Sequence, residues 1–298
     1  AVKSMLGFKI MDGAMGSELI RRGLTLPNHI WSAEANINNP KIVQKIHGEY
    51  VDAGADYITA NTFRTTPRSY LKTGVGDEKS LHMAKDSLFK AVKIAKGVAG
   101  SSVKVIGSIA PMEDCYAPKL FPNNDMAVAE FTQLGKWLSE VGIDILLLET
   151  MNSLAETEAA LIGIDKFSIP VWVSFVLKDS DNLLSGDSIA QTIEIIKRYS
   201  VECILINCNP LDRTVMAVEK LVDNWTGNWG AYPNLGIGEP SPDGNIQHYE
   251  EMNKFVSTME KIIEKQPFVL GACCGSSPRH IAELIRLRNE SHILPYIL

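Results

Sequence analysis

Four large apolar residues lead directly into a carboxylate in the stretch Ile145-Leu146-Leu147-Leu148-Glu149-Thr150. A continuous apolar run of this length suits a β-strand buried on both faces, as in a parallel sheet covered by helices. Seven other short apolar or β-branched runs are followed by turn residues in the same way. The eight expected strands span 8–14, 57–63, 103–111, 145–150, 170–176, 203–209, 229–234 and 268–274.

Amphipathic stretches long enough for helices separate these strands. They cover 40–53, 78–98, 126–141, 153–164, 187–199, 211–225 and 246–265. Pro40 and Ser153 are suited to helix starts, and Gly54, Gly100 and Gly142 to helix ends. Strand–helix alternation repeated eight times predicts an α/β (β/α)8 TIM barrel that occupies residues 1–298 as a single domain. A doubly wound sheet is the alternative, but no G-x-G-x-x-G or phosphate-binding loop follows the first strand.

The overall composition narrows the class of protein further. Of the 298 residues, 45% are apolar and 21% are charged, which is enough apolar material for a full core. The formal charge of −6 argues against nucleic acid or an anionic membrane as the main partner. No apolar run approaches the roughly 18 residues of a membrane span, and no apolar leader opens the chain. We therefore expect a cytoplasmic protein, and its five cysteines suit a reducing compartment better than a disulfide framework.

Three cysteines stand where expected strands end. Cys208 closes the strand at 203–209, and the adjacent pair Cys273-Cys274 closes the last one. Neighbouring residues on a strand point to opposite faces, so the pair can share a ligand only where the strand breaks. The turn residues at 275–278 supply that break. Three thiolates that meet there predict a zinc site with one coordination position open.

A simpler interpretation of the cysteines is packing, because free cysteine is among the most buried residue types. The adjacent pair also lacks the C-x-x-C spacing of zinc ribbons and redox dithiols. The remaining two cysteines, Cys115 and Cys203, are predicted to be structural.

Other polar residues also fall at the carboxyl ends of the expected strands, where barrel enzymes place their active sites. Asp12 and Glu149 each follow an apolar run, and a carboxylate there is costly to bury unless a cation joins it. The alternatives are a turn role for Asp12 and a salt bridge for Glu149. Asn61 and Ser174 are candidates for substrate contact or for internal hydrogen bonding.

These residues together resemble the homocysteine S-methyltransferase family, including the homocysteine-binding module of cobalamin-dependent methionine synthase. The likeness covers nearly the whole chain, and its most specific parts are the lone cysteine and the tandem pair. It is carried by Asp12-Gly13-Ala14-Met15-Gly16-Ser17-Glu18-Leu19, Thr59-Ala60-Asn61-Thr62-Phe63, Leu148-Glu149-Thr150, Asn207-Cys208 and Gly271-Ala272-Cys273-Cys274-Gly275. Ala272 and Ser17 are small departures from the family pattern, and 108–114 diverges more strongly.

The resemblance implies that Cys208, Cys273 and Cys274 bind Zn²⁺. It also implies that Asp12 and Glu149 hold the amino group of homocysteine, with Gly13 helping to place the amino acid. The implied reaction is methyl transfer to the homocysteine thiol, giving methionine. The expected donor is a small sulfonium, S-methylmethionine or S-adenosylmethionine. Trp229 and Tyr232 are candidates for its aromatic rim, and packing in the barrel or a loop is an equal alternative for both. The alternative donor is a methyl group carried by a corrinoid partner protein.

Two other classes of protein compete with this interpretation. A barrel aldolase or lyase with merely packed cysteines would use a strand-end lysine for Schiff-base chemistry, and none of the eight expected ends has one. A zinc-binding interaction scaffold would not need carboxylates at the same mouth as the metal.

Overall fold

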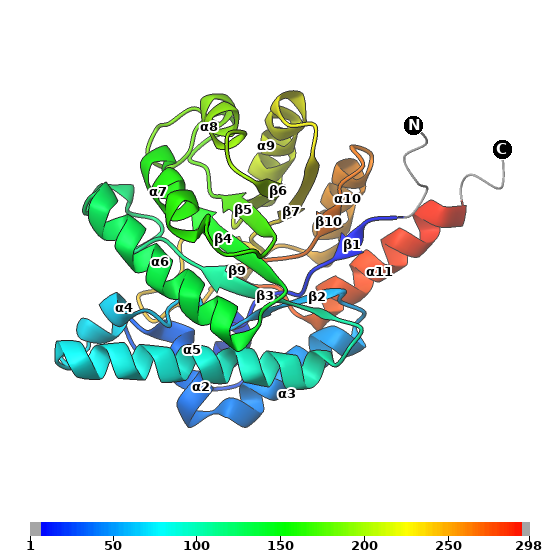
Figure 1. Ribbon diagram of the computed structural model, residues 1–298. Coiled ribbons are helices and arrows are strands. Elements are labelled where there is room, and N and C mark those ends of the chain that lie inside the picture. Colours follow the sequence, from blue (N-terminus) through cyan, green and yellow to red (C-terminus); the bar gives the residue numbers. More distant parts are fainter. Residues whose placement is uncertain (1–6, 294–298) are drawn as a thin grey trace.

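The computed structural model describes residues 7–293, and its parallel strands surround a common axis with helices outside them (Figure 1). The order around the barrel is β1-β10-β7-β6-β5-β4-β3-β2. A parallel bridge between Met11 and Tyr57 brings β1 beside β2, and the Asp56 amide donates to the Ile10 carbonyl at 2.7 Å. The predicted (β/α)8 barrel is confirmed. Its strands are β1 (Lys9–Ile10), β2 (Tyr57–Ala60), β3 (Lys104–Ile109), β4 (Ile145–Met151), β5 (Val171–Phe175), β6 (Val201–Asn207), β7 (Asn228–Tyr232) and β10 (Val269–Leu270).

The helices cover the outside of this barrel. Ser153 caps one of them by accepting the Glu156 amide at 3.3 Å, Pro40 opens another, and Gly142 ends a third in the left-handed region (φ 80°), as predicted. The α-helices are α1 (Gly16–Arg21), α2 (Ala35–Asn38), α3 (Pro40–Asp52), α4 (Pro67–Leu71), α5 (Asp77–Ala99), α6 (Asn124–Val141), α7 (Leu154–Ile164), α8 (Ile189–Ile196), α9 (Leu211–Asn224), α10 (Met252–Ile263) and α11 (Pro278–Ile293). Two 3₁₀ helices, η1 (Trp31–Glu34) and η2 (Pro118–Leu120), lie in the connections.

One expected helix is shorter than predicted. The stretch 246–265 was expected to be helical throughout, but α10 begins only at Met252. The residues before it belong to a hairpin of β8 (Gly236–Ile237) and β9 (His248–Tyr249). Gly238 and Gly244 adopt positive φ in its connection, which a helix does not accommodate. This hairpin belongs to the connection that follows β7.

Strand alternation divides the core into two layers. On β6, Ile204 and Ile206 pack outward against the helices, whereas Cys203 and Leu205 face the barrel interior. The interior is filled with apolar side chains, and Trp172 stands at its centre with Tyr57 at 5.1 Å and Phe268 at 6.1 Å between ring centroids. The interior cluster consists of Met11, Ile106, Ile145, Leu147, Trp172, Cys203, Leu205, Tyr232 and Val269. The barrel is therefore a packed core, and space for chemistry lies at its ends.

Within residues 7–293, none of the helices has both the length and the apolar character that crossing a membrane requires.

Candidate functional site

Polar side chains form a layer at the carboxyl ends of the strands, directly above the apolar interior. On β4, Ile145 and Leu147 face the interior, and Glu149 follows two residues later on the same face. On each of four other strands, the same alternation places a polar residue at the carboxyl end of the row of side chains that faces the barrel interior. The resulting polar layer consists of Ser108, Glu149, Ser174, Asn207 and Tyr232.

Hydrogen bonds connect the members of the polar layer. The hydroxyls of Ser108 and Tyr232 both donate to the Glu149 carboxylate, the latter at 3.1 Å. Ser174 donates to Asn207 Oδ1 at 2.6 Å. Burial raises the pKa of Glu149, and these two hydroxyl donors oppose that rise. Glu149 is therefore held in a fixed orientation by neutral groups.

Asp12 places a second carboxyl group at the same end of the barrel. It accepts the Thr59 amide at 2.8 Å and the Thr59 hydroxyl at 3.1 Å, and it is 6% exposed. Burial raises the pKa of Asp12 to about 8, and the charge of Glu149 adds to that rise. Within residues 7–293, neither carboxyl forms an ion pair with a lysine, arginine or histidine. A buried Asp12 and a partly buried Glu149, with no cation paired to either among the described residues, are suited to bind an incoming positive group such as an ammonium.

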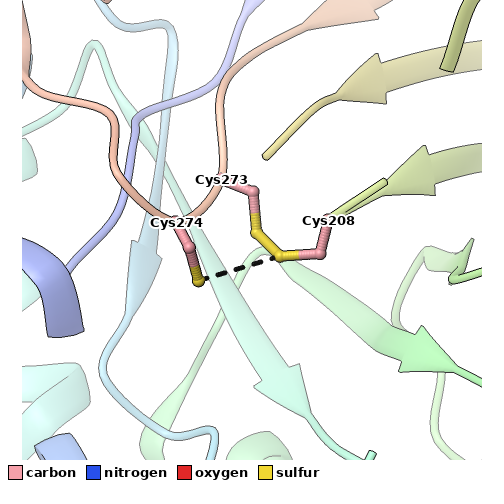
Figure 2. A group of neighbouring side chains, drawn as sticks. All are labelled: Cys208, Cys273 and Cys274. Atoms are coloured by element: carbon pink, nitrogen blue, oxygen red, sulfur yellow. Dashed lines mark hydrogen bonds between the residues drawn. A yellow bond between two sulfur atoms is a disulfide. The ribbon is translucent and has the colours of Figure 1, made fainter. Parts of the chain in front are cut away.

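The three predicted cysteines come together, as Figure 2 shows. Their sulfur atoms all lie within 4.8 Å of one another. Cys273 lies beside Asn207 of the polar layer. The tandem pair can converge because β10 ends at Leu270, so Cys273 and Cys274 lie in a turn that Gly275 closes with a φ of 82°. Cys208 also leaves its strand with a positive φ of 54°. The predicted break in the strand is thus present at both sources of sulfur.

One pair of the sulfur atoms has the spacing of two ligands on a tetrahedral metal ion. Two sulfurs that each lie about 2.3 Å from such an ion are about 3.8 Å apart. The Cys208 and Cys274 sulfurs are 3.9 Å apart. Cys273 is half-buried and Cys274 is exposed, so the cluster opens toward the outside of the mouth. Soft sulfur donors of this kind select zinc and related ions.

Cys208 and Cys273 are joined as a disulfide, which differs from the expectation of three free thiols. The physical cause is the same proximity that allows the cluster to hold a metal ion, because two thiols held this close can also oxidise to a disulfide. Reduction restores two thiols at the positions that metal binding needs. Cys115 and Cys203 lie outside the cluster and are buried, which agrees with their predicted packing role.

The remaining candidates occupy different surroundings. The Asn61 amide is fully used by the protein: it accepts from the Ser32 hydroxyl at 2.8 Å and donates to Asn36 Oδ1 at 2.9 Å. Ser174 lies in the polar layer beside Asn207, whose amide nitrogen is 4.0 Å from the Cys273 sulfur. Trp229 packs outward into the main core and so does not form part of the mouth.

Sequence reasoning did not assign Thr59, Ser108 and Asn207 to the site. Ser108 and Asn207 each lie two residues beyond an interior apolar residue, as Glu149 does, so period-two alternation is the signal that identifies them. From the sequence, Tyr232 is a candidate for contact with a donor or for packing. Its hydroxyl instead orients Glu149.

Gly13 lies where β1 leads into α1, and no side chain fits there. A Cβ at this position would be 2.6 Å from the Ser276 hydroxyl oxygen and 2.7 Å from the Tyr50 hydroxyl oxygen. We expect Gly13→Ala to lower the free energy of unfolding by about 1–3 kcal/mol, because two buried side chains must move. Denaturant unfolding measures this, with Gly48→Ala as the control, since a Cβ there meets nothing within 4 Å. Equal stability of both variants would contradict the close contact.

The fold and the site together define a barrel enzyme with a sulfur-ligand site for a metal ion at the carboxyl ends of its strands. The sequence model of the family described as Homocysteine S-methyltransferase matches residues 9–287. The chain therefore belongs to the homocysteine S-methyltransferase family.

Individual relatives agree with this assignment over nearly their whole length. Homocysteine S-methyltransferase 2 of Arabidopsis thaliana is 27% identical, over 94% of this chain and 92% of the relative. The homocysteine methyltransferase MmuM of Escherichia coli has the same fold in its metallated form, with a TM-score of 0.82 and 23% identity over 95% of this chain and 97% of that one. Its oxidized form gives a TM-score of 0.81 at 23% identity, over 94% and 96% of the two chains.

Proposed function

We propose that this protein transfers a methyl group to the thiol of homocysteine, giving methionine, with Zn²⁺ held by Cys208, Cys273 and Cys274. The observation that carries the proposal is the presence of three clustered sulfurs at the same end of the barrel as a buried Asp12 and a partly buried Glu149, neither paired with a cation within residues 7–293. Homocysteine has both matching groups, a thiol at one end and an ammonium at the other. Membership of the family supports this choice of substrate.

Zinc suits the donor set because it favours four ligands in a tetrahedron and accepts thiolates readily. Three cysteines leave one position open, which is the arrangement of a catalytic site. The chemistry that bound zinc supplies is the deprotonation of a coordinated thiol, which otherwise is only a few per cent thiolate at neutral pH.

The protein's own residues place the substrate. Asp12 and Glu149 pair with the substrate ammonium, and this fixes which end of the amino acid faces the cysteines. Ser108 and Tyr232 keep the Glu149 carboxylate in position for that contact. In the reaction, a bond forms between the methyl carbon and the homocysteine sulfur, the bond from that carbon to the donor breaks, and the thiol proton passes to solvent.

The other predicted residues have supporting parts in this proposal. Ser174 contacts the substrate from the polar layer. Gly13 leaves room at the start of α1, and Asn61 maintains the carboxyl end of β2 through its bonds to Ser32. As donor we propose S-methylmethionine or S-adenosylmethionine, because a cationic sulfonium is attracted to a mouth lined with carboxyls and thiolates.

An assay of methionine formation tests the proposal. Reduced, zinc-loaded protein is incubated with homocysteine and, in turn, S-methylmethionine, S-adenosylmethionine and a methyl-corrinoid protein. Turnover with a sulfonium supports the proposed donor, and turnover with the corrinoid alone replaces it by the partner-protein alternative. Absence of methionine with every donor, in protein that binds no zinc, would refute the proposed function.

Proton release offers a separate test of the ammonium site. Asp12 has a pKa of about 8 in the free protein, so it is mostly protonated at pH 7 and must ionise to pair with an ammonium. We expect methionine to bind more tightly as the pH rises from 6 to 8, with release of up to one proton per molecule bound at the lower pH. Calorimetry in two buffers of different ionisation enthalpy measures this release. Asp12→Asn should lower this proton release, and pH-independent binding by the unaltered protein would contradict the role of Asp12.

A further inference from the structure

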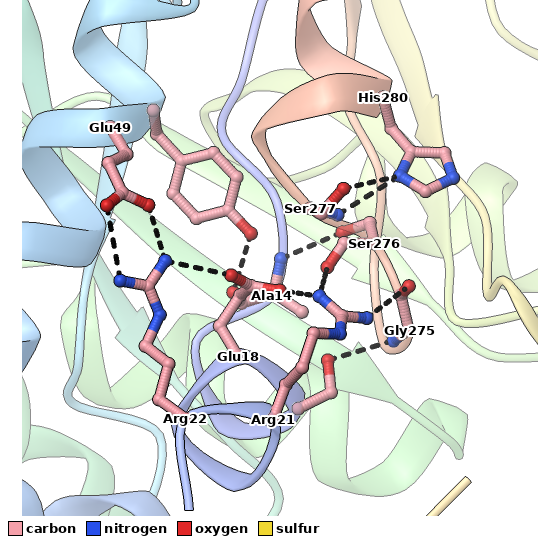
Figure 3. A network of polar contacts seen from close by, with 11 residues as sticks. Ala14, Glu18, Arg21, Arg22, Glu49, Gly275, Ser276, Ser277 and His280 are labelled. Carbon is pink, nitrogen blue, oxygen red and sulfur yellow. Dashed lines mark hydrogen bonds and ion pairs between the residues drawn. The ribbon is translucent and has the colours of Figure 1, made fainter. Parts of the chain in front are cut away.

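A group of polar contacts ties the turn that follows the tandem cysteines to the start of α1, as Figure 3 shows. The Gly275 amide donates to the Ser17 hydroxyl at 2.9 Å. The Ala14 amide donates to the Ser276 hydroxyl at 2.9 Å, and the Tyr50 hydroxyl donates to the Ala14 carbonyl at 2.7 Å. These contacts join two segments that are more than 250 residues apart in the sequence.

Arg21 makes the remaining contacts between the two segments. Its guanidinium donates to the Gly275 carbonyl at 3.2 Å and to the Ser276 carbonyl at 3.5 Å. These are the two carbonyls that follow directly after Cys274. On its other side, Arg21 pairs with Glu18, whose side chain is almost fully buried at 4% exposure. The Arg21 guanidinium also lies 5.5 Å from the centre of the Tyr249 ring on β9.

β10 does not extend into this turn. The Cys273 amide donates to the Pro233 carbonyl and the Leu235 amide donates to the Cys274 carbonyl, each at 2.8 Å. Arg21 holds the two carbonyls that follow. Cys273 and Cys274 are adjacent, and an extended chain would direct them to opposite faces. The chain turns directly after them, where Gly275 has a positive φ of 82°. Charged hydrogen bonds to the two carbonyls hold the backbone in that conformation.

We propose that Arg21 is a positioning residue for the metal centre, fixing the turn at Gly275 and Ser276 so that both tandem cysteines face Cys208. This inference rests on the proposed zinc site and adds to it a residue that touches neither metal nor substrate. Since the same segment of chain leads from Asp12 into α1, the contacts also hold the carboxyl side of the site against the sulfur side.

Arg22 provides a matched control. It follows Arg21 directly, just beyond the end of α1, and it also pairs with Glu18, at 3.0 Å. Its other partner is Glu49 of α3, and within residues 7–293 it makes no hydrogen bond to the 275–277 turn. Arg21→Ala and Arg22→Ala therefore both disturb the buried Glu18, but only Arg21→Ala releases the turn.

The test compares metal binding by the reduced proteins. Zinc affinity is measured by competition with a chromogenic chelator, and cobalt(II) substitution reports the sulfur coordination through its visible absorption. Loss of an outer partner of a metal site typically lowers metal affinity about 10- to 100-fold. We expect Arg21→Ala to show a loss of this size with altered cobalt bands, Arg21→Lys to recover part of it, and Arg22→Ala to match the unaltered protein.

The outcomes separate this inference from the proposed function. If the unaltered protein binds neither zinc nor cobalt, the proposed function fails and this inference fails with it. If the unaltered protein binds both but Arg21→Ala binds them equally well, only the role of Arg21 is refuted. If Arg22→Ala loses as much affinity as Arg21→Ala, the effect comes from α1 as a whole, and the specific role of Arg21 is again refuted.

Discussion

Cys208→Ala is expected to lose bound zinc and, with it, at least about 10³-fold in the rate of methionine formation. A metal centre that polarises its ligand is worth several kcal/mol in a reaction of this kind, and each 1.36 kcal/mol corresponds to a factor of ten. Without Cys208, the tandem pair supplies two ligands where the site needs three. The residual rate should rise with pH toward the thiol pKa of about 8.5, because homocysteine must then ionise without help.

The measurement is zinc content per chain after dialysis, followed by activity under reducing conditions. Reduction matters because a disulfide between Cys208 and Cys273 removes two ligands in the unaltered protein. Cys203→Ala is the matched control: it makes the same chemical change on β6, five residues earlier, but at a side chain that packs in the barrel interior. Full zinc content and activity in Cys208→Ala would remove the three-cysteine site from the mechanism.

The barrel could be predicted from the sequence because its strands are buried on both faces. Runs such as 145–148 contain no polar residue, and the turn residues after each run mark its carboxyl end. The pairing order and the closure between β1 and β2 follow from that architecture. The hairpin of β8 and β9 could not be predicted in the same way. Its strands are two residues each, too short to show a period.

The candidate site also contains residues that could be predicted from the sequence and residues that could not. The tandem cysteines and Glu149 could be identified from the sequence, because reactive side chains stand out where they follow an apolar run. Thr59 could not, because threonine is common and its role here depends on which strand lies beside it. The contact of Arg21 with Gly275 joins opposite ends of the chain, and no local pattern indicates it.

Glu149→Gln is expected to weaken homocysteine binding about 100-fold while leaving zinc content unchanged. The substitution keeps the shape of the side chain and its place in the polar layer but removes the negative charge that faces the ammonium. Loss of one partner from a buried charge pair typically costs about 2–5 kcal/mol, and 100-fold corresponds to about 2.7 kcal/mol. Because the sulfurs come from other strands, the metal ligands should be unaffected.

Glu158→Gln is the appropriate control for this change. Glu158 on α7 accepts a hydrogen bond from the Tyr199 hydroxyl at 2.8 Å, just as Glu149 accepts one from Tyr232, but it lies outside the polar layer. Equilibrium binding of homocysteine to the zinc-loaded variants gives the affinities, and metal analysis of the same samples gives zinc content.

A deamino analogue of homocysteine, which lacks the ammonium, tests whether Glu149 acts on that group. If Glu149 pairs with the ammonium, the analogue should bind the unaltered protein and Glu149→Gln with nearly equal affinity. A 100-fold difference that persists with the analogue would show that Glu149 acts on some other part of the substrate.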